Sequence, residues 1–127
     1  LKAIEIHERD KIIEHVKKVA PIFQARLRKL DEHPLVGEAR GVGLIGALEL
    51  VADKRTKRAF DSKTTVGARC VEFLQELGVI NRAMGDAVAF CPPLIITADE
   101  IQELFDAVEI ALDKTEAWVA REGLRTL

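Results

Sequence analysis

The sequence predicts an α+β domain with a small, mostly antiparallel sheet of about four strands covered by helices, in the order α-ββ-α-ββ-α. Two observations predict this class. Apolar residues recur at helical spacing in three segments, near the start, the middle and the end of the chain. Between these segments lie two pairs of short strand-like runs, each pair separated by a turn that contains glycine. The 127 residues are enough for one domain.

The first helix is expected from Asp10 to about Leu30, where apolar residues form one stripe and charged residues take the other side. Pro21 lies inside this pattern. Because proline has no N–H donor, we expect a kink or an interruption there. The dipeptide His33-Pro34 then ends the segment.

Two strands are expected between Val36 and Val51. The stretch ARGVGLIGALEL within them places Gly41, Gly43 and Gly46 in the G-x-G-x-x-G spacing of dinucleotide-binding proteins. That motif needs a helix after the glycines, because the helix N-terminus holds the pyrophosphate. A strand-like run follows here instead, so no βαβ unit fits. We therefore interpret the glycines as permitting a tight turn and close packing of the strands.

A helix is expected from Val66 to Leu77, with Gly78 at the position that follows its C-cap. Residues 79–82 (VINR) and 87–92 (AVAFCP) are predicted as two short strands around the turn at residues 83–86 (AMGD).

The last helix is predicted to begin at a capping box, in which Thr97 and Glu100 each bind the other's backbone N–H. Apolar residues at helical spacing continue from there to Val119. The terminal REGLRTL is expected to fray.

The net charge of −2 and the pI near 6.0 give no electrostatic footprint for nucleic acid or for an anionic membrane, so neither partner is expected. We interpret the four cations of the basic cluster as part of a solvated loop: Lys54, Arg55, Lys57 and Arg58. No apolar run approaches the roughly 20 residues of a membrane span, and no signal peptide is visible.

The two cysteines, Cys70 and Cys91, form no C-x-x-C pair, and His7, His15 and His33 have no partner at ligand spacing. A metal site is therefore not expected, and the histidines are interpreted as surface or helix-end residues. Free thiols fit a reducing compartment, so we expect a cytoplasmic protein. Catalytic motifs such as a P-loop or a nucleophile elbow are missing from the sequence.

Arg82 is the candidate binding residue. It is expected at the end of a short strand, just before a glycine turn, where its guanidinium could lean over a neighbouring cleft. A guanidinium suits bidentate binding of a carboxylate. The alternative from spacing alone is an exposed arginine that pairs with Asp86 or with water.

Two long stretches, HPLVGEARGVGLIGALELV and VINRAMGDAVAFCPPLIITADEIQEL, resemble the C-terminal segment of class III pyridoxal-phosphate-dependent aminotransferases, in particular the ω-amino acid:pyruvate and amine:pyruvate transaminases. The resemblance covers nearly the whole chain. It implies that residues 1–127 are the C-terminal part of the small domain, in a fold-type I enzyme that moves an amino group from an amine or ω-amino acid to a keto acid such as pyruvate.

The resemblance also implies a large domain that holds pyridoxal 5′-phosphate, with its Schiff-base lysine upstream of this segment. None of the lysines here lies in a matching context: Lys2, Lys11, Lys17, Lys18, Lys29, Lys54, Lys57, Lys63 and Lys114. We therefore expect no catalytic residue in this chain, no cofactor bound to it and no activity of the chain alone. The full-length enzyme is expected to be a homodimer.

By the same resemblance, Arg82 corresponds to the mobile arginine that binds the substrate carboxylate, swinging in for amino and keto acids and out for apolar amines. The turn after it would supply the mobility, with Gly85 as its soft point. Arg40 is given a packing or ion-pair role on the first predicted strand.

Two alternatives remain open: an independent α+β ligand-sensing or interaction module, and a family member specialised on decarboxylation or isomerisation. The chain starts inside a helix pattern and without Met, which we interpret as a piece of a longer protein. Such a piece should leave an apolar face unpaired, whereas an independent module should have a complete surface.

Overall fold

The computed structural model describes residues 1–126. Its helices are α1 (Lys2–Arg9), α2 (Ile12–Lys29), α3 (Val66–Glu76) and α4 (Ala98–Arg121), and its strands are β1 (Val36–Val42), β2 (Ile45–Leu50), β3 (Arg82–Met84) and β4 (Ala87–Phe90). The strands form one antiparallel sheet in the order β1-β2-β4-β3. The predicted α+β class is confirmed, and the short helix α1 is added before the predicted order.

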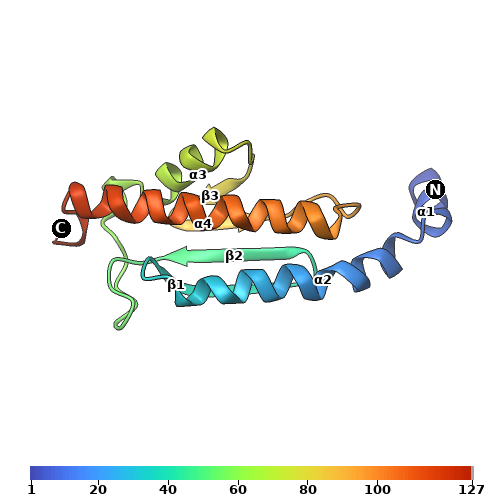
Figure 1. Ribbon diagram of the computed structural model, residues 1–127, viewed down its shortest axis with the longest axis horizontal. Helices are drawn as coiled ribbons and strands as arrows, with labels where there is room; N and C mark the ends of the chain where they lie inside the picture. Colours follow the sequence, from blue (N-terminus) through green and yellow to red (C-terminus); the bar gives the residue numbers. More distant parts are fainter. Residues whose placement is uncertain (127) are drawn as a thin grey trace.

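The core lies between one face of this sheet and the helices, of which α2 and α4 run side by side along it (Figure 1). Successive side chains of a strand point to opposite faces. On β2 and β4, the buried Leu48 and Leu50 therefore lie on the same face as Val88 and Phe90. Within the core, the rings of Phe23 and Phe105 join α2 to α4 edge to face, with centroids 5.1 Å apart.

Glycine lets α2 approach the sheet closely. Gly41 and Gly46 face each other across β1 and β2. A Cβ at Gly46 would lie 2.6 Å from Leu27 Cδ2 and 3.2 Å from Phe23 Cε1, and one at Gly41 would lie 2.9 Å from the same Leu27 atom. The turn between the two strands holds Gly43 at φ +60°, a conformation that favours glycine. The predicted turn and close packing are both confirmed.

The first helical segment breaks at a different place from the one predicted. Pro21 lies inside α2, which continues to Lys29, and the break falls at Lys11, with φ +51°, between α1 and α2. Proline leaves the carbonyl of Lys17 without its helical donor. Pro21 and Lys17 are both exposed, so this carbonyl lies where solvent can reach it, and the helix is not interrupted.

The third strand also starts later than predicted. Gly78, at φ +86°, ends α3 in a Schellman motif, in which Gly78 N–H binds Gln75 O at 3.0 Å and Val79 N–H binds Leu74 O at 2.9 Å. Val79 therefore completes the helix end instead of entering the sheet. As a result, Arg82 is the first residue of β3 and not the last of a strand.

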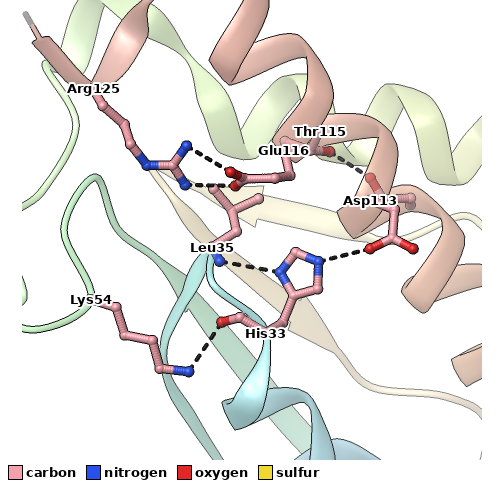
Figure 2. Close-up of polar contacts among 8 residues, drawn as sticks. His33, Leu35, Lys54, Asp113, Thr115, Glu116 and Arg125 are labelled. Carbon is pink, nitrogen blue, oxygen red and sulfur yellow. Dashed lines mark hydrogen bonds and ion pairs between the residues drawn. The ribbon is translucent and has the colours of Figure 1, made fainter.

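The C-terminal segment is anchored, so the prediction that it frays is wrong for residues 121–126; Leu127 lies outside the described residues. Arg125 binds both carboxylate oxygens of Glu116 at 2.7 and 2.6 Å (Figure 2). It also donates to Ala52 O at 3.0 Å. From the basic loop, which is present as predicted, Lys54 donates to His33 O at 3.1 Å and Arg58 donates to Arg125 O at 2.7 Å. The loop cations thus also fasten neighbouring segments.

His33 was expected at the surface or at a helix end; it is the C-cap residue of the short 3-10 helix Leu30–Glu32, and only 14% of its side chain is exposed. Its Nδ1 accepts a hydrogen bond from Leu35 N–H, and its Nε2 lies 2.9 Å from Asp113 on α4 (Figure 2). Because Nδ1 is an acceptor, the proton is on Nε2 and is donated to the carboxylate. His33 therefore ties the start of β1 to α4.

The turn between β3 and β4 is fastened at Asp86. The Asp86 carbonyl accepts from Leu50 N–H at 2.9 Å, and its carboxylate accepts from Gly67 N–H, in the first turn of α3, at 2.9 Å. Burial raises the pKa of the Asp86 carboxyl above its ordinary value; the bond from Gly67 opposes that shift and the charge of Glu49 adds to it.

The capping box at the start of α4 is confirmed, with Glu100 N–H bound to Thr97 Oγ1 at 3.2 Å and Thr97 N–H bound to Glu100 Oε1 at 3.0 Å. Across residues 1–126, none of the helices combines the length and the apolar character needed to cross a membrane.

The close approach of α2 gives a stability prediction. Gly46→Ala should lower the free energy of unfolding by about 1–3 kcal/mol, because the new methyl group overpacks Leu27 and Phe23. The matched control is Ala47→Thr, on the opposite face of the same strand, which should stay within about 0.5 kcal/mol of the parent. Urea unfolding of the chain measures both. Equal effects of the two substitutions would contradict the packing argument.

The Asp86 carboxyl gives a pH prediction. A raised pKa means that the folded state holds the proton more tightly than the unfolded state does. The contribution of Asp86 to stability should therefore fall as the pH rises from its ordinary pKa through the raised value. Asp86→Asn keeps the acceptor for Gly67 N–H but does not titrate. The stability of the parent chain relative to this variant should thus decline over that range; a flat or rising difference would refute the assignment.

Candidate functional site

The face of the sheet opposite the helices carries the candidate site; we call it the open face. The register of the strands places ten residues on it: Glu38, Arg40 and Val42 of β1, Ile45, Ala47 and Glu49 of β2, Ala87 and Ala89 of β4, and Arg82 and Met84 of β3. Val42, Ile45 and Met84 are 75%, 59% and 58% exposed, although all three are apolar. An exposed apolar face of this kind is what the sequence predicts for a piece of a larger protein.

One cross-strand row of the open face has an arginine at each end. Arg40 pairs with Ala47, Ala47 with Ala89, and Ala89 with Arg82. Neighbouring strands are about 4.8 Å apart, so the two arginine Cα atoms are separated by three strand spacings, or roughly 14 Å. The two alanines leave a shallow floor between guanidinium groups that can reach over it from either side.

The two arginines differ in their partners. Arg40 donates to Glu38 at 3.3 Å and to Glu49 at 3.2 Å, so it has the ion-pair role that was predicted for it. Among residues 1–126, no carboxylate oxygen lies within 4.0 Å of the Arg82 guanidinium. The alternative partner Asp86 instead binds Gly67 N–H. Arg82 is exposed, and its charge is available to an anion.

A groove of about 740 Å³ begins beside Arg82, between the β3–β4 edge and the first turns of α4. Its walls are mostly apolar and include Val79, Phe90, Pro92 and Leu104. The exposed Cys91 also lines it, whereas Cys70 is buried in the core, where burial raises the pKa of its thiol to about 11. Arg82 therefore stands where this groove meets the open face.

The residues around Arg82 fit the binding of a carboxylate but not the holding of an aldehyde cofactor. A Schiff base requires a lysine amine, and neither the open face nor the lining of the groove includes a lysine. Lys54 and Lys57 donate to backbone carbonyls at the other end of the sheet. In the described part of the chain, no three His, Cys, Asp or Glu side chains gather in a group that could hold a metal ion.

Arg82 could be selected from the sequence, but its neighbours on the open face could not. Ala47 and Ala89 become its neighbours only through the pairing of β2 with β4, which are separated by more than thirty-five residues of chain. Alternation within each strand was the available signal, and it sorts side chains between two faces without telling which strands are adjacent.

Comparison with known proteins identifies the family. The model of the family described as aminotransferase class-III matches residues 1–112, which is most of the chain.

Among curated relatives, the putrescine–pyruvate aminotransferase of Pseudomonas aeruginosa is 47% identical over 120 residues, covering 94% of this chain and 26% of that protein. The chain thus spans about a quarter of the length of this relative.

Solved structures agree with the sequence match. An omega-transferase from Vibrio fluvialis superposes with a TM-score of 0.91 at 42% identity, covering 94% of this chain and 29% of that one. A PLP-bound aminotransferase mutant from the same organism gives a TM-score of 0.89 at 41% identity, covering 93% of this chain and 26% of that one. Sequence and fold agree: the chain belongs to the class III aminotransferase family.

Proposed function

We propose that residues 1–127 are the C-terminal small-domain portion of a pyridoxal-phosphate-dependent aminotransferase, which moves an amino group from an amine or ω-amino acid to a keto acid such as pyruvate. The family match and the name of the putrescine–pyruvate relative support this reaction. The observation that carries the role of this chain is Arg82, an arginine on the open face with no carboxylate partner among the described residues.

In this proposal Arg82 binds the carboxylate of the keto acid or amino acid substrate. A guanidinium can bind both carboxylate oxygens in one plane, which fixes the orientation of the substrate as well as its position. Arg40 lies in the same row but is already neutralised by Glu38 and Glu49. The substrate carboxylate therefore has a single strong partner on this face, at the β3 edge.

Pyridoxal 5′-phosphate in the full-length enzyme would supply the carbonyl that takes up the amino group. Because the residues around Arg82 do not fit the holding of this group, we assign its binding to the remainder of the polypeptide. The chain alone is then inactive, and its part in the reaction is to bind and orient the carboxylate.

The open face is the surface that we assign to contact with that remainder. Burial of its exposed apolar residues Val42, Ile45 and Met84 against another surface would be favourable in free energy, because apolar surface is removed from water. Packing of the large domain over this face would also enclose Arg82 beside the cofactor. We further propose that the full-length enzyme is a cytoplasmic homodimer.

Substitution of Arg82 in the full-length enzyme tests the proposal. Arg82→Ala should lower kcat/KM for the keto acid by about 10- to 150-fold, because a desolvated charge-assisted contact is lost. The half-reaction of a neutral amine donor should change far less. Single-turnover measurements of the two half-reactions separate these effects.

The matched control is Arg55→Ala, which removes an exposed arginine from the basic loop and should change neither half-reaction. Arg82→Lys should recover only part of the loss, because an ammonium group cannot bind two oxygens in one plane. If Arg82→Ala lowered kcat/KM equally for the keto acid and for the neutral amine, the proposed role would be contradicted.

A further inference from the structure

Arg82 lies on β3, a short edge strand whose own hydrogen bonds do little to fix its position in the sheet. β3 has only three residues, and it lies at the edge of the sheet, paired with β4 alone. Short edge strands have few backbone hydrogen bonds to keep them in place. The position of the Arg82 backbone therefore depends on what fastens the β3–β4 hairpin to the rest of the domain.

Asp86 makes hydrogen bonds that join this hairpin to the rest of the domain. Its carbonyl binds Leu50 N–H at the end of β2, and its carboxylate binds Gly67 N–H in the first turn of α3, each at 2.9 Å. The N–H groups of a first helical turn lack partners within the helix, and an anionic acceptor suits them. One residue of the turn thus joins the hairpin to β2 and to α3.

Gly67 adds a steric contact to these hydrogen bonds. A Cβ at position 67 would lie 2.2 Å from Gly85 O and 2.9 Å from Asp86 Cα, so the helix backbone lies directly against the backbone of the turn. Gly85 itself has φ +60°, as the two-residue turn requires. The turn therefore has little room to shift toward α3.

The Asp86 carboxylate is half-buried and is not used to neutralise Arg82, four residues earlier on the same hairpin. Burying a carboxylate carries a cost, which hydrogen bonds offset in part. Here the carboxylate holds the turn, and the guanidinium is left without a partner on the open face. The two charged groups of the hairpin thus have separate uses.

We propose that Asp86 is a positioning residue for Arg82: by fastening the hairpin turn to α3, it holds the backbone of β3 in place beneath the arginine. This inference rests on the proposed function of Arg82 as the carboxylate-binding residue. The proposal also says which part of the hairpin moves when Arg82 swings. A guanidinium that swings in and out does so by rotation of the arginine side chain, while the turn at Gly85 stays fixed.

The experiment uses the full-length enzyme loaded with its cofactor. Asp86→Ala should raise KM for the keto acid by about 3- to 10-fold, as expected for the loss of one hydrogen bond that holds the binding group. Its kcat, and the KM for a neutral amine donor, should stay within about twofold of the parent. Asp86→Asn, which retains an oxygen acceptor for Gly67 N–H, should restore the KM for the keto acid.

Two further variants make the test decisive. Gly67→Ala should raise the same KM by displacing the turn with the carboxylate intact, and it carries the test if Asp86→Ala does not fold. Arg82→Ala/Asp86→Ala should lose no more keto-acid selectivity than Arg82→Ala does, because Asp86 acts through Arg82.

The outcomes separate this inference from the proposed function. If Arg82→Ala is selective for the keto acid but Asp86→Ala and Gly67→Ala weaken both substrates alike, or if the double variant shows additive selective losses, Asp86 is only structural and the inference is overturned. If Arg82→Ala itself is not selective, the proposed function has failed, and this inference loses its basis.

Discussion

The structure depends on the close approach of α2 to the sheet at the facing pair Gly41 and Gly46. Because neither residue has a Cβ, the side chains of Phe23 and Leu27 lie directly on the strand backbones. The rings of Phe23 and Phe105 then bring α4 alongside α2 on the same face. One consequence is that the large buried side chains of β2 and β4, namely Leu48, Leu50, Val88 and Phe90, lie on that face, whereas the apolar side chains of Val42, Ile45 and Met84 on the other face are exposed.

Because side chains alternate along a strand, this packing also decides which residues lie on the open face. Leu48 and Val88 are fixed in the core, so their neighbours Ala47 and Ala89 must face outward, and Arg82 is in register with Ala89. A slip of β3 by one residue would move Arg82 to the core face. The burial of Val88 and its pairing with Ala83 therefore determine where the guanidinium lies, although neither residue carries a charge.

Local chemistry explains which parts of this arrangement the sequence could predict. The capping box at Thr97 and the glycine turns involve residues a few positions apart, and they are found as predicted. The failures involve partners that are distant in the chain. The C-terminal segment is held because Arg125 donates to Ala52 O, and the half-buried ring of His33 is bound to Asp113 of α4. Neither pairing is visible in spacing.

Arg82 shows a second limit on what can be predicted from neighbouring residues in the sequence. From its own neighbours along the chain, an exposed arginine paired with Asp86 or with water is the better interpretation; only the resemblance to the aminotransferases favours the binding role. The contacts supply an independent physical reason, because Asp86 is committed to Gly67 and the nearby acids Glu38 and Glu49 are committed to Arg40.

An arginine that must bind a carboxylate in one half of a reaction and make room for an apolar amine in the other needs a long, flexible side chain on a fixed base. If the base moved as well, part of the binding free energy would go into ordering the backbone each time the carboxylate entered. The hairpin meets this requirement, since its turn is fastened to α3 and β2 through Asp86 while the guanidinium has no partner among the described residues. In the proposed role, a fixed backbone and a side chain free to rotate are thus adjacent on one short hairpin, with the half-buried carboxylate of Asp86 holding the backbone.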